Sequence, residues 1–134
     1  MRQAKVILLV DDEAIVLLAL KREFHNAFGP CYRCETALDG AEALHIVAAL
    51  AEEGAELLLV FSDWLMPGMK GDELLTRIHR DRPDTKLVLL TGHADEDAIA
   101  AVEQEAELLA CVRKPWNFQT IKALVRRADP EAPG

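Results

Sequence analysis

Short apolar segments alternate with longer amphipathic segments along the whole chain. Residues 5–10 and 57–62 are almost continuously apolar, which is typical of strands that are buried on both faces of a parallel sheet. Three weaker or shorter apolar runs predict further strands. The five predicted strands cover, approximately, residues 5–10, 31–36, 57–62, 86–90 and 109–113.

The amphipathic segments between these strands predict five helices, because their apolar positions recur at helical spacing and Gly or Pro residues close them. Gly29 and Pro30 end the first helix, and Pro83 follows the third. The predicted helices cover, approximately, residues 11–28, 40–54, 72–80, 95–105 and the segment that carries Ile121, Leu124 and Val125 on one face. Alternating strands and helices predict an α/β fold, a doubly wound, flavodoxin-like parallel sheet in the order 2-1-3-4-5 with helices on both faces.

Composition indicates one ordered domain. The chain has 134 residues, of which 51% are hydrophobic and 28% charged, so it can bury a core and has little spare length. We assign residues 1–128 to this domain and residues 129–134 to a short disordered tail. The formal net charge of -8 would repel nucleic acid and anionic bilayers, and no apolar run approaches the ~20 residues of a membrane-spanning helix. We therefore expect a cytoplasmic protein without direct contacts to nucleic acid or membrane.

Chemically active side chains follow four of the five predicted strands. They are Asp11 and Asp12 after the first strand, Asp63 after the third, Thr91 after the fourth and Lys114 after the fifth. In a doubly wound sheet of this order, the carboxyl ends of the first and third strands flank the point where the strand order reverses, and ligands bind there. Three carboxylates close together repel one another unless a cation compensates them, and such an all-oxygen site suits Mg²⁺.

This combination of groups fits phosphoryl transfer. A carboxylate can accept a phosphoryl group as an acyl phosphate, and Mg²⁺, the Thr91 hydroxyl and the Lys114 ammonium would position that group and neutralise its oxygens. Plainer interpretations exist: Asp11 and Asp12 as helix caps, Thr91 as part of a turn, Lys114 as a strand exit. Asp63 lies between apolar segments and has no such explanation. Chance would have to place such residues at four strand ends independently, which is improbable. The pattern therefore favours a functional site.

Four segments at these strand ends closely resemble the receiver domain of bacterial two-component response regulators. They occur in the order found in that family, and the resemblance extends over about residues 5–127. The matching segments are residues 6–13 (VILLVDDE), 62–71 (SDWLMPGMKG), 89–92 (LLTG) and 112–115 (VRKP).

The resemblance implies a phosphoacceptor and a metal site. Asp63 would be the residue that becomes phosphorylated. Asp12, Asp63 and the backbone carbonyl of Leu65 would bind Mg²⁺ directly, whereas Asp11 would act mainly through water. By this resemblance the protein is a signalling switch and not an enzyme in the usual sense, since its chemistry is limited to Mg²⁺-dependent self-phosphorylation and autodephosphorylation.

The resemblance also implies partners. Thr91 would hold a phosphoryl oxygen, and Lys114 would pair with the phosphoryl group delivered by a sensor histidine kinase or a phosphotransfer protein. The signal would pass to a downstream effector or to a fused output domain. A homodimer through the surface formed by the fourth helix, the fifth strand and the last helix is a further implication.

Three residues depart from the family pattern. The family usually has Tyr or Phe three positions before the lysine, where this sequence has Cys111, so the aromatic part of the switch cannot operate as usual. Leu65 and His93 stand two positions after the phosphoacceptor and two after the threonine. In the family these positions influence how water reaches the acyl phosphate, and an apolar Leu65 cannot orient that water.

Two other functions remain open on the sequence alone. Cys111 suggests a degenerate receiver that acts only as a phosphorylation-independent docking module. The other is a small Mg²⁺-dependent phosphatase with an Asp nucleophile, which would need that nucleophile in the first strand, a second acid two residues on and a cap over the site. Residues 11–13 and the short chain fit the phosphatase poorly. A nucleotide-binding domain is excluded because no Gly-rich loop follows the first strand.

Overall fold

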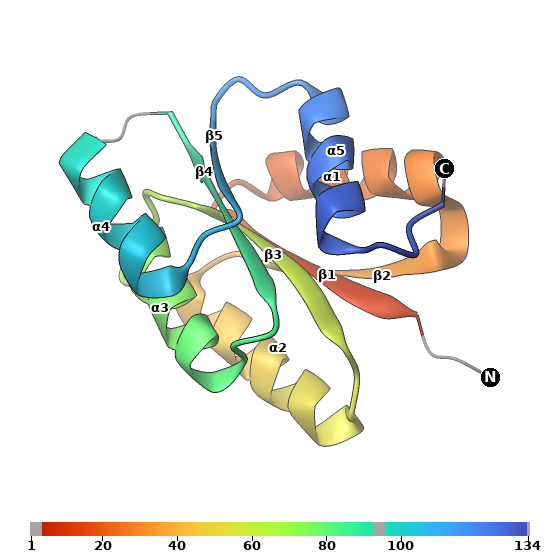
Figure 1. The fold of residues 1–134 in the computed structure, drawn as a ribbon, viewed down its shortest axis with the longest axis horizontal. Coiled ribbons are helices and arrows are strands. Elements are labelled where there is room, and N and C mark those ends of the chain that lie inside the picture. Colours follow the sequence, from red (N-terminus) through yellow and green to blue (C-terminus); the bar gives the residue numbers. More distant parts are fainter. Residues whose placement is uncertain (1–3, 93–95, 134) are drawn as a thin grey trace.

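The computed structural model, which describes residues 4–92 and 96–133, is a five-stranded parallel sheet with helices on both faces (Figure 1). The strand order is β2-β1-β3-β4-β5, so the predicted α/β fold and its 2-1-3-4-5 order are confirmed. The strands are β1 Lys5–Val10, β2 Tyr32–Ala37, β3 Leu57–Asp63, β4 Lys86–Thr91 and β5 Ala110–Arg113.

Two hydrophobic layers enclose the sheet. The helices α1 and α5 cover one face, where Phe24 of α1 and Ile121 of α5 share a core cluster. The helices α2, α3 and α4 cover the other face, where Leu50, Leu74 and Val102 belong to the second cluster. The helices are α1 Ala14–Phe28, α2 Gly40–Glu53, α3 Gly71–Asp81, α4 Glu96–Ala106 and α5 Phe118–Ala128.

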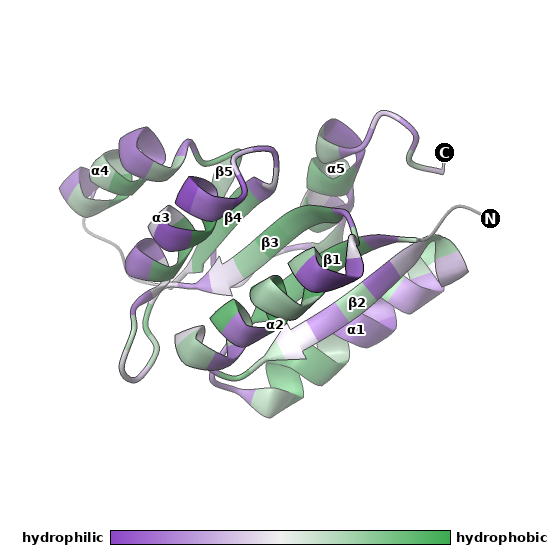
Figure 2. Ribbon diagram, turned by 90° about the horizontal axis from the view of Figure 1, so that it is seen from below, coloured by the Kyte–Doolittle hydropathy of each residue, from purple (hydrophilic) through white to green (hydrophobic). Residues whose placement is uncertain are grey.

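The central strands supply both layers at once. In β1, Val6, Leu8 and Val10 face α2 and α3, whereas Ile7 and Leu9 face α1 and α5, as the alternation of side chains along a strand requires. Every residue of β3 is buried, but β2 is an edge strand and is only partly covered. Figure 2 shows this difference as hydrophobic colour along most of β3 and hydrophilic segments in β2.

Among the boundaries that differ from the predicted ones are the start of β2 and the end of β3. Strand β2 begins at Tyr32 because Gly29–Cys31 forms a short 3-10 helix with Pro30 in its first turn. Strand β3 extends to Asp63, since Asp63 pairs with Leu90 of β4. Each of these shifts is only a residue or two, which leaves the site residues at the strand ends where they were predicted.

The assignment of Asp129 to a disordered tail is wrong. Asp129 is buried, its backbone N–H donates to the Val125 carbonyl, and its carboxylate accepts hydrogen bonds from Lys5 at 2.7 Å and from the Tyr32 hydroxyl at 2.6 Å. These contacts attach the end of α5 to β1 and β2. The ordered fold therefore includes Asp129, although the sequence around it is polar and rich in Pro.

Candidate functional site

Three carboxylates meet at the carboxyl ends of β1 and β3. These strands are neighbours with Val10 opposite Ser62, so the residues that follow them lie side by side. One oxygen from each of Asp11, Asp12 and Asp63 lies within 4.8 Å of the others. Asp11 and Asp63 are buried and Asp12 is exposed, which makes the cluster a site with one side open to solvent.

Lys114 reaches this cluster from β5. Its backbone N–H donates to the Thr91 carbonyl, and its peptide bond to Pro115 is cis. The ammonium nitrogen lies 3.0 Å from Oδ1 of Asp63 and 3.4 Å from Oδ2 of Asp11. Burial alone would lower the pKa of Lys114, but the hydrogen bond to Asp63 and the charges of both carboxylates raise it above its ordinary value. Lys114 is therefore a fixed positive charge in the site.

The negative charge of Asp11 costs the folded protein free energy, because this carboxylate is buried. Burial raises the pKa of Asp11 above its ordinary value, although the Glu13 N–H and the Lys114 ammonium oppose the rise. The nearby charge of Asp63 adds to it. A bound cation would relieve this cost, because it offsets the repulsion between the carboxylates.

Asp63 is held in place by neighbouring groups. Its Oδ1 accepts hydrogen bonds from the Trp64 backbone N–H at 2.9 Å and from Lys114 at 3.0 Å. Its carbonyl oxygen accepts a hydrogen bond from the hydroxyl of Ser62. Among the residues that the structure describes, both hydrogen bonds to the carboxylate end on Oδ1, so Oδ2 is left for another ligand.

Thr91 supplies a buried hydroxyl with no hydrogen-bond partner in the described part of the chain. Its exposed fraction is 1%. Leaving a buried hydroxyl unpaired costs roughly 1–3 kcal/mol, so such a group needs an explanation. Since Thr91 ends the strand beside β3, at the same edge of the sheet as Asp63, a ligand with an acceptor oxygen at this edge would satisfy it.

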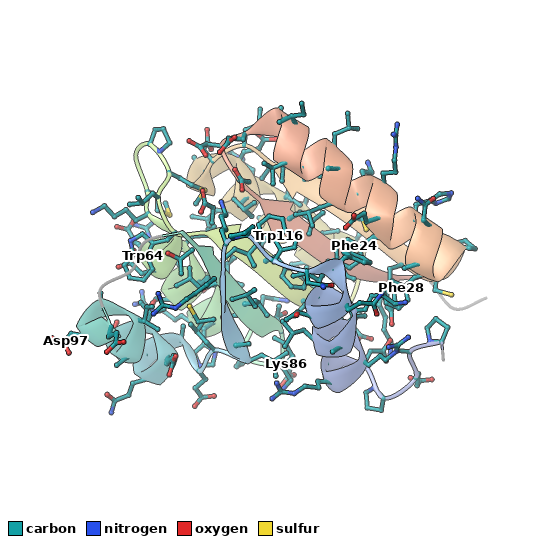
Figure 3. All side chains as sticks on the ribbon, turned by 90° about the horizontal axis from the view of Figure 1, so that it is seen from above. Phe24, Phe28, Trp64, Lys86, Asp97 and Trp116 are labelled. Carbon is teal, nitrogen blue, oxygen red and sulfur yellow. The ribbon has the colours of Figure 1, made fainter. Side chains whose placement is uncertain are left out.

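Two tryptophans and two of the residues that depart from the family pattern belong to the surroundings of the site. Trp64 and Trp116, both labelled in Figure 3, follow β3 and β5 at this edge of the sheet, and Trp64 is buried. The side chain of Leu65 is 51% exposed. Cys111 is half-buried in β5 and lines a cavity of about 360 Å³ against α4. His93 lies outside the described residues.

Sequence reasoning found the charged groups and missed the contacts that fix them. Ser62, which donates to the Asp63 carbonyl, gave no signal because a hydroxyl at the end of an apolar strand is common. In the sequence Gly71 is only one residue of the matching segment 62–71, yet its backbone N–H donates to the Trp64 carbonyl at 2.8 Å. Such contacts depend on the packing of α3 against β3 and leave little trace in residue types.

Comparisons with known proteins agree with this geometry. Residues 7–126 match the model of the response regulator receiver domain, and the chain belongs to this family. The DNA-binding transcriptional regulator NtrC of Escherichia coli K12 is 33% identical over 126 residues, which make up 94% of this chain and 25% of NtrC. The chain thus spans about a quarter of the length of this curated relative.

Solved structures with the same fold include two receiver proteins. The signal receiver domain of an HD domain-containing protein from Pseudomonas fluorescens Pf-5 has 34% identity and a TM-score of 0.83, and the match covers 94% of each chain. The response regulator TrrA of Thermotoga maritima, solved in complex with Mg²⁺-BeF, has 30% identity and a TM-score of 0.77, with 93% of this chain and 99% of that chain covered.

The donor set of this site suits Mg²⁺. All three carboxylates offer hard oxygen ligands, and Asp12 faces solvent, as expected for an ion that keeps several of its water molecules.

In the described residues no helix is long and apolar enough to cross a membrane.

Proposed function

We propose that this domain is a phosphoacceptor switch of a two-component phosphorelay, in which Asp63 accepts a phosphoryl group. The observation that carries the proposal is the buried hydroxyl of Thr91, which has no hydrogen-bond partner among the described residues and lies at the same sheet edge as the Asp63 carboxylate that contacts Lys114. A phosphoryl group on Asp63 would bring acceptor oxygens to both residues. Membership of the receiver family supports the same function.

The proposed step forms one bond and breaks one. A carboxylate oxygen of Asp63 bonds to phosphorus while the bond from phosphorus to the donor's histidine nitrogen breaks, and the electron pair stays on that nitrogen. Lys114 neutralises one oxygen of the transferred group, and the Thr91 hydroxyl donates a hydrogen bond to another. The product is an acyl phosphate on Asp63.

Mg²⁺, when bound, would neutralise charge on the phosphoryl oxygens. We propose that Asp12, Asp63 and the backbone carbonyl of Leu65 hold it directly and that Asp11 acts through water. Asp11 is suited to an indirect role because its Oδ1 already accepts a hydrogen bond from the Glu13 backbone N–H at 2.9 Å. Asp12 is exposed and better suited to an ion that retains water.

The proposed partners follow from this chemistry. The phosphoryl donor is a sensor histidine kinase or a phosphotransfer protein in the cytoplasm. The recipient of the signal is a downstream effector or a fused output domain. The surface of α4, β5 and α5 is the proposed site of a homodimer, and Cys111 on β5 means that any switch there operates without the usual aromatic side chain.

A phosphorylation-independent docking module is the second candidate, and Cys111 is the residue that favours it. We prefer the switch because Lys114 contacts Asp63 and the buried Thr91 hydroxyl ends the neighbouring strand at the same edge of the sheet, and a docking module has no use for either. Lys114 contacts Asp63 at the end of β3. This favours the switch over a phosphatase, which would have its nucleophile after β1.

Phosphate incorporation tests the proposed function. The purified domain is incubated with acetyl phosphate, with and without Mg²⁺, and its intact mass is measured. The switch predicts the mass of one added phosphoryl group, only when Mg²⁺ is present. A domain that binds Mg²⁺ and takes up no phosphate from acetyl phosphate or from histidine-phosphorylated donors would instead be the docking module.

A further inference from the structure

The loop of residues 64–70 joins β3 to α3 and carries Leu65, whose carbonyl the proposed function assigns to the metal. Each end of this loop packs against a glycine, Trp64 against Gly71 and Met69 against Gly40, and neither contact leaves room for a side chain on the glycine. Neither glycine has a positive φ, so the requirement is for space and not for an unusual backbone conformation.

Gly71 holds the end of the loop next to Asp63. Its backbone N–H donates to the Trp64 carbonyl at 2.8 Å, which closes the loop onto the strand end. A Cβ on Gly71 would overlap the carbonyl oxygen of Asp63 and would lie 3.1 Å from both the Asp63 carbonyl carbon and the Trp64 Cα. All three neighbours are backbone atoms, which cannot rotate away. A side chain at position 71 would therefore move the backbone of Asp63 or the start of α3.

Gly40 holds the other part of the loop against α2. A Cβ on Gly40 would lie 2.9 Å from Cβ and 2.9 Å from Sδ of Met69, whose side chain also packs against the core. Asp39 fixes the start of α2, because its carboxylate accepts a hydrogen bond from the Glu42 N–H at 2.8 Å. Met69 thus packs against the first residue of a helix whose N-terminus is capped.

We propose that Gly71 and Gly40 are positioning residues for the metal and phosphoryl site. Gly71 acts through the Asp63 backbone, and Gly40 acts through Met69 and the loop that carries the Leu65 carbonyl. Metal affinity depends on how well the protein fixes its ligands, and loss of an outer support typically costs about 10- to 100-fold. This inference rests on the proposed function, since it concerns the same ligands.

The test is calorimetric titration of the intact chain with Mg²⁺. Gly71→Ala is expected to raise the Mg²⁺ dissociation constant at least about 10-fold. The matched control is Gly54→Ala at the far end of α2, where φ is +70° and nothing lies within 4 Å, so Ala strains the backbone without touching the site. Gly54→Ala is expected to lower the melting temperature and leave the dissociation constant unchanged. Equal Mg²⁺ affinity in folded Gly71→Ala and in the parent would overturn the inference.

A double-mutant cycle keeps the test decisive if Gly71→Ala fails to fold. Gly40→Ala is expected to weaken Mg²⁺ binding in the parent and to have little further effect in a Met69→Gly background, because Cβ, Cγ and Sδ of Met69, the atoms that the new methyl group would meet, are then all gone. Equal effects of Gly40→Ala in both backgrounds, or none in either, would contradict the inference. If the parent itself binds no Mg²⁺, it is the proposed function that fails.

Discussion

The ammonium nitrogen of Lys114 lies 3.0 Å from Oδ1 of Asp63, although the two residues are 51 positions apart. The contact places a positive charge beside the carboxylate before any phosphoryl group arrives. It also uses Oδ1, which the Trp64 N–H contacts as well. The proposed transfer of a phosphoryl group to Asp63 would therefore need little rearrangement of Lys114.

Thr91→Val is expected to leave the metal-free domain as stable as the parent or more stable by about 1 kcal/mol, because the hydroxyl that it removes is buried and has no hydrogen-bond partner in the described part of the chain. It is expected to slow phosphate uptake from acetyl phosphate. The control is Thr85→Val, which removes a buried hydroxyl that donates to the Leu57 carbonyl at 2.7 Å. That variant should lose about 1 kcal/mol in urea unfolding. A loss in Thr91→Val as large as in Thr85→Val would show that the Thr91 hydroxyl is already satisfied.

Asp11→Asn is expected to stabilise the metal-free domain at neutral pH by about 1 kcal/mol, the usual scale of a single substitution. Burial raises the pKa of Asp11, so the folded state holds the proton more tightly than the unfolded state. The stability contributed by this group is therefore lost as the pH rises above the ordinary pKa of an aspartate, about 4. Asn keeps the oxygen that accepts the Glu13 N–H and removes the charge. Urea unfolding at pH 7 without metal measures the change.

Asp12→Asn is the matched control for that variant. Asp12 is exposed, so its neutralisation should alter metal-free stability by less than about 0.5 kcal/mol. It should nevertheless weaken Mg²⁺ binding at least as much as Asp11→Asn, as followed by the fluorescence of buried Trp64. Equal stability of the two variants would contradict the cost assigned to the buried charge of Asp11.

The contacts of Asp129 predict an acid-dependent loss of stability. Burial on its own would raise the pKa of Asp129, but the hydrogen bonds from Lys5 and Tyr32 hold it below its ordinary value. The stability from this carboxylate is therefore present above about pH 4 and lost as the pH falls through its lowered pKa. Tyr32→Phe should cost about 1.5–3 kcal/mol at pH 7 and progressively less below pH 4.

The control for Tyr32→Phe lies on the same strand. Arg33→Gln removes exposed ion pairs with Glu35 and Glu53, which solvent screens, so this variant should unfold almost as the parent does across the pH range. Unfolding curves from pH 2.5 to pH 7 compare both variants with the parent. A pH-independent difference between Tyr32→Phe and the parent would show that the hydroxyl does not bond to a charged Asp129.

Leu65→Asn is expected to shorten the lifetime of the phosphorylated domain by ~10- to 100-fold, because Asn can orient the attacking water and Leu cannot. The side chain of Leu65 is exposed, so the substitution should not disturb the fold. Leu38→Asn, at another exposed leucine, is the control and should leave the lifetime unchanged. A Leu65→Asn variant that holds its phosphate as long as the parent would show that Leu65 does not slow hydrolysis.

Residue types and periodicity predicted the topology and the position of the acids at the strand ends, because both leave local signals in the sequence. The apolar run that ends at Asp11 and the one that ends at Asp63 indicate buried strands and place their acids at one edge of the sheet. Contacts between distant segments were not predictable in this way. The carboxylate of Asp129 looks like part of a polar tail until Tyr32, 97 positions away, is seen to donate to it.

The most direct test of the central claim is to locate the phosphoryl group. The domain is phosphorylated with acetyl phosphate and Mg²⁺ and reduced with borohydride, which converts an aspartyl phosphate to homoserine, and its peptides are analysed by mass spectrometry. Our account predicts homoserine at position 63 in the parent and no incorporation in Asp63→Asn. Homoserine at position 11 or 12, or undiminished phosphate in Asp63→Asn, would contradict it.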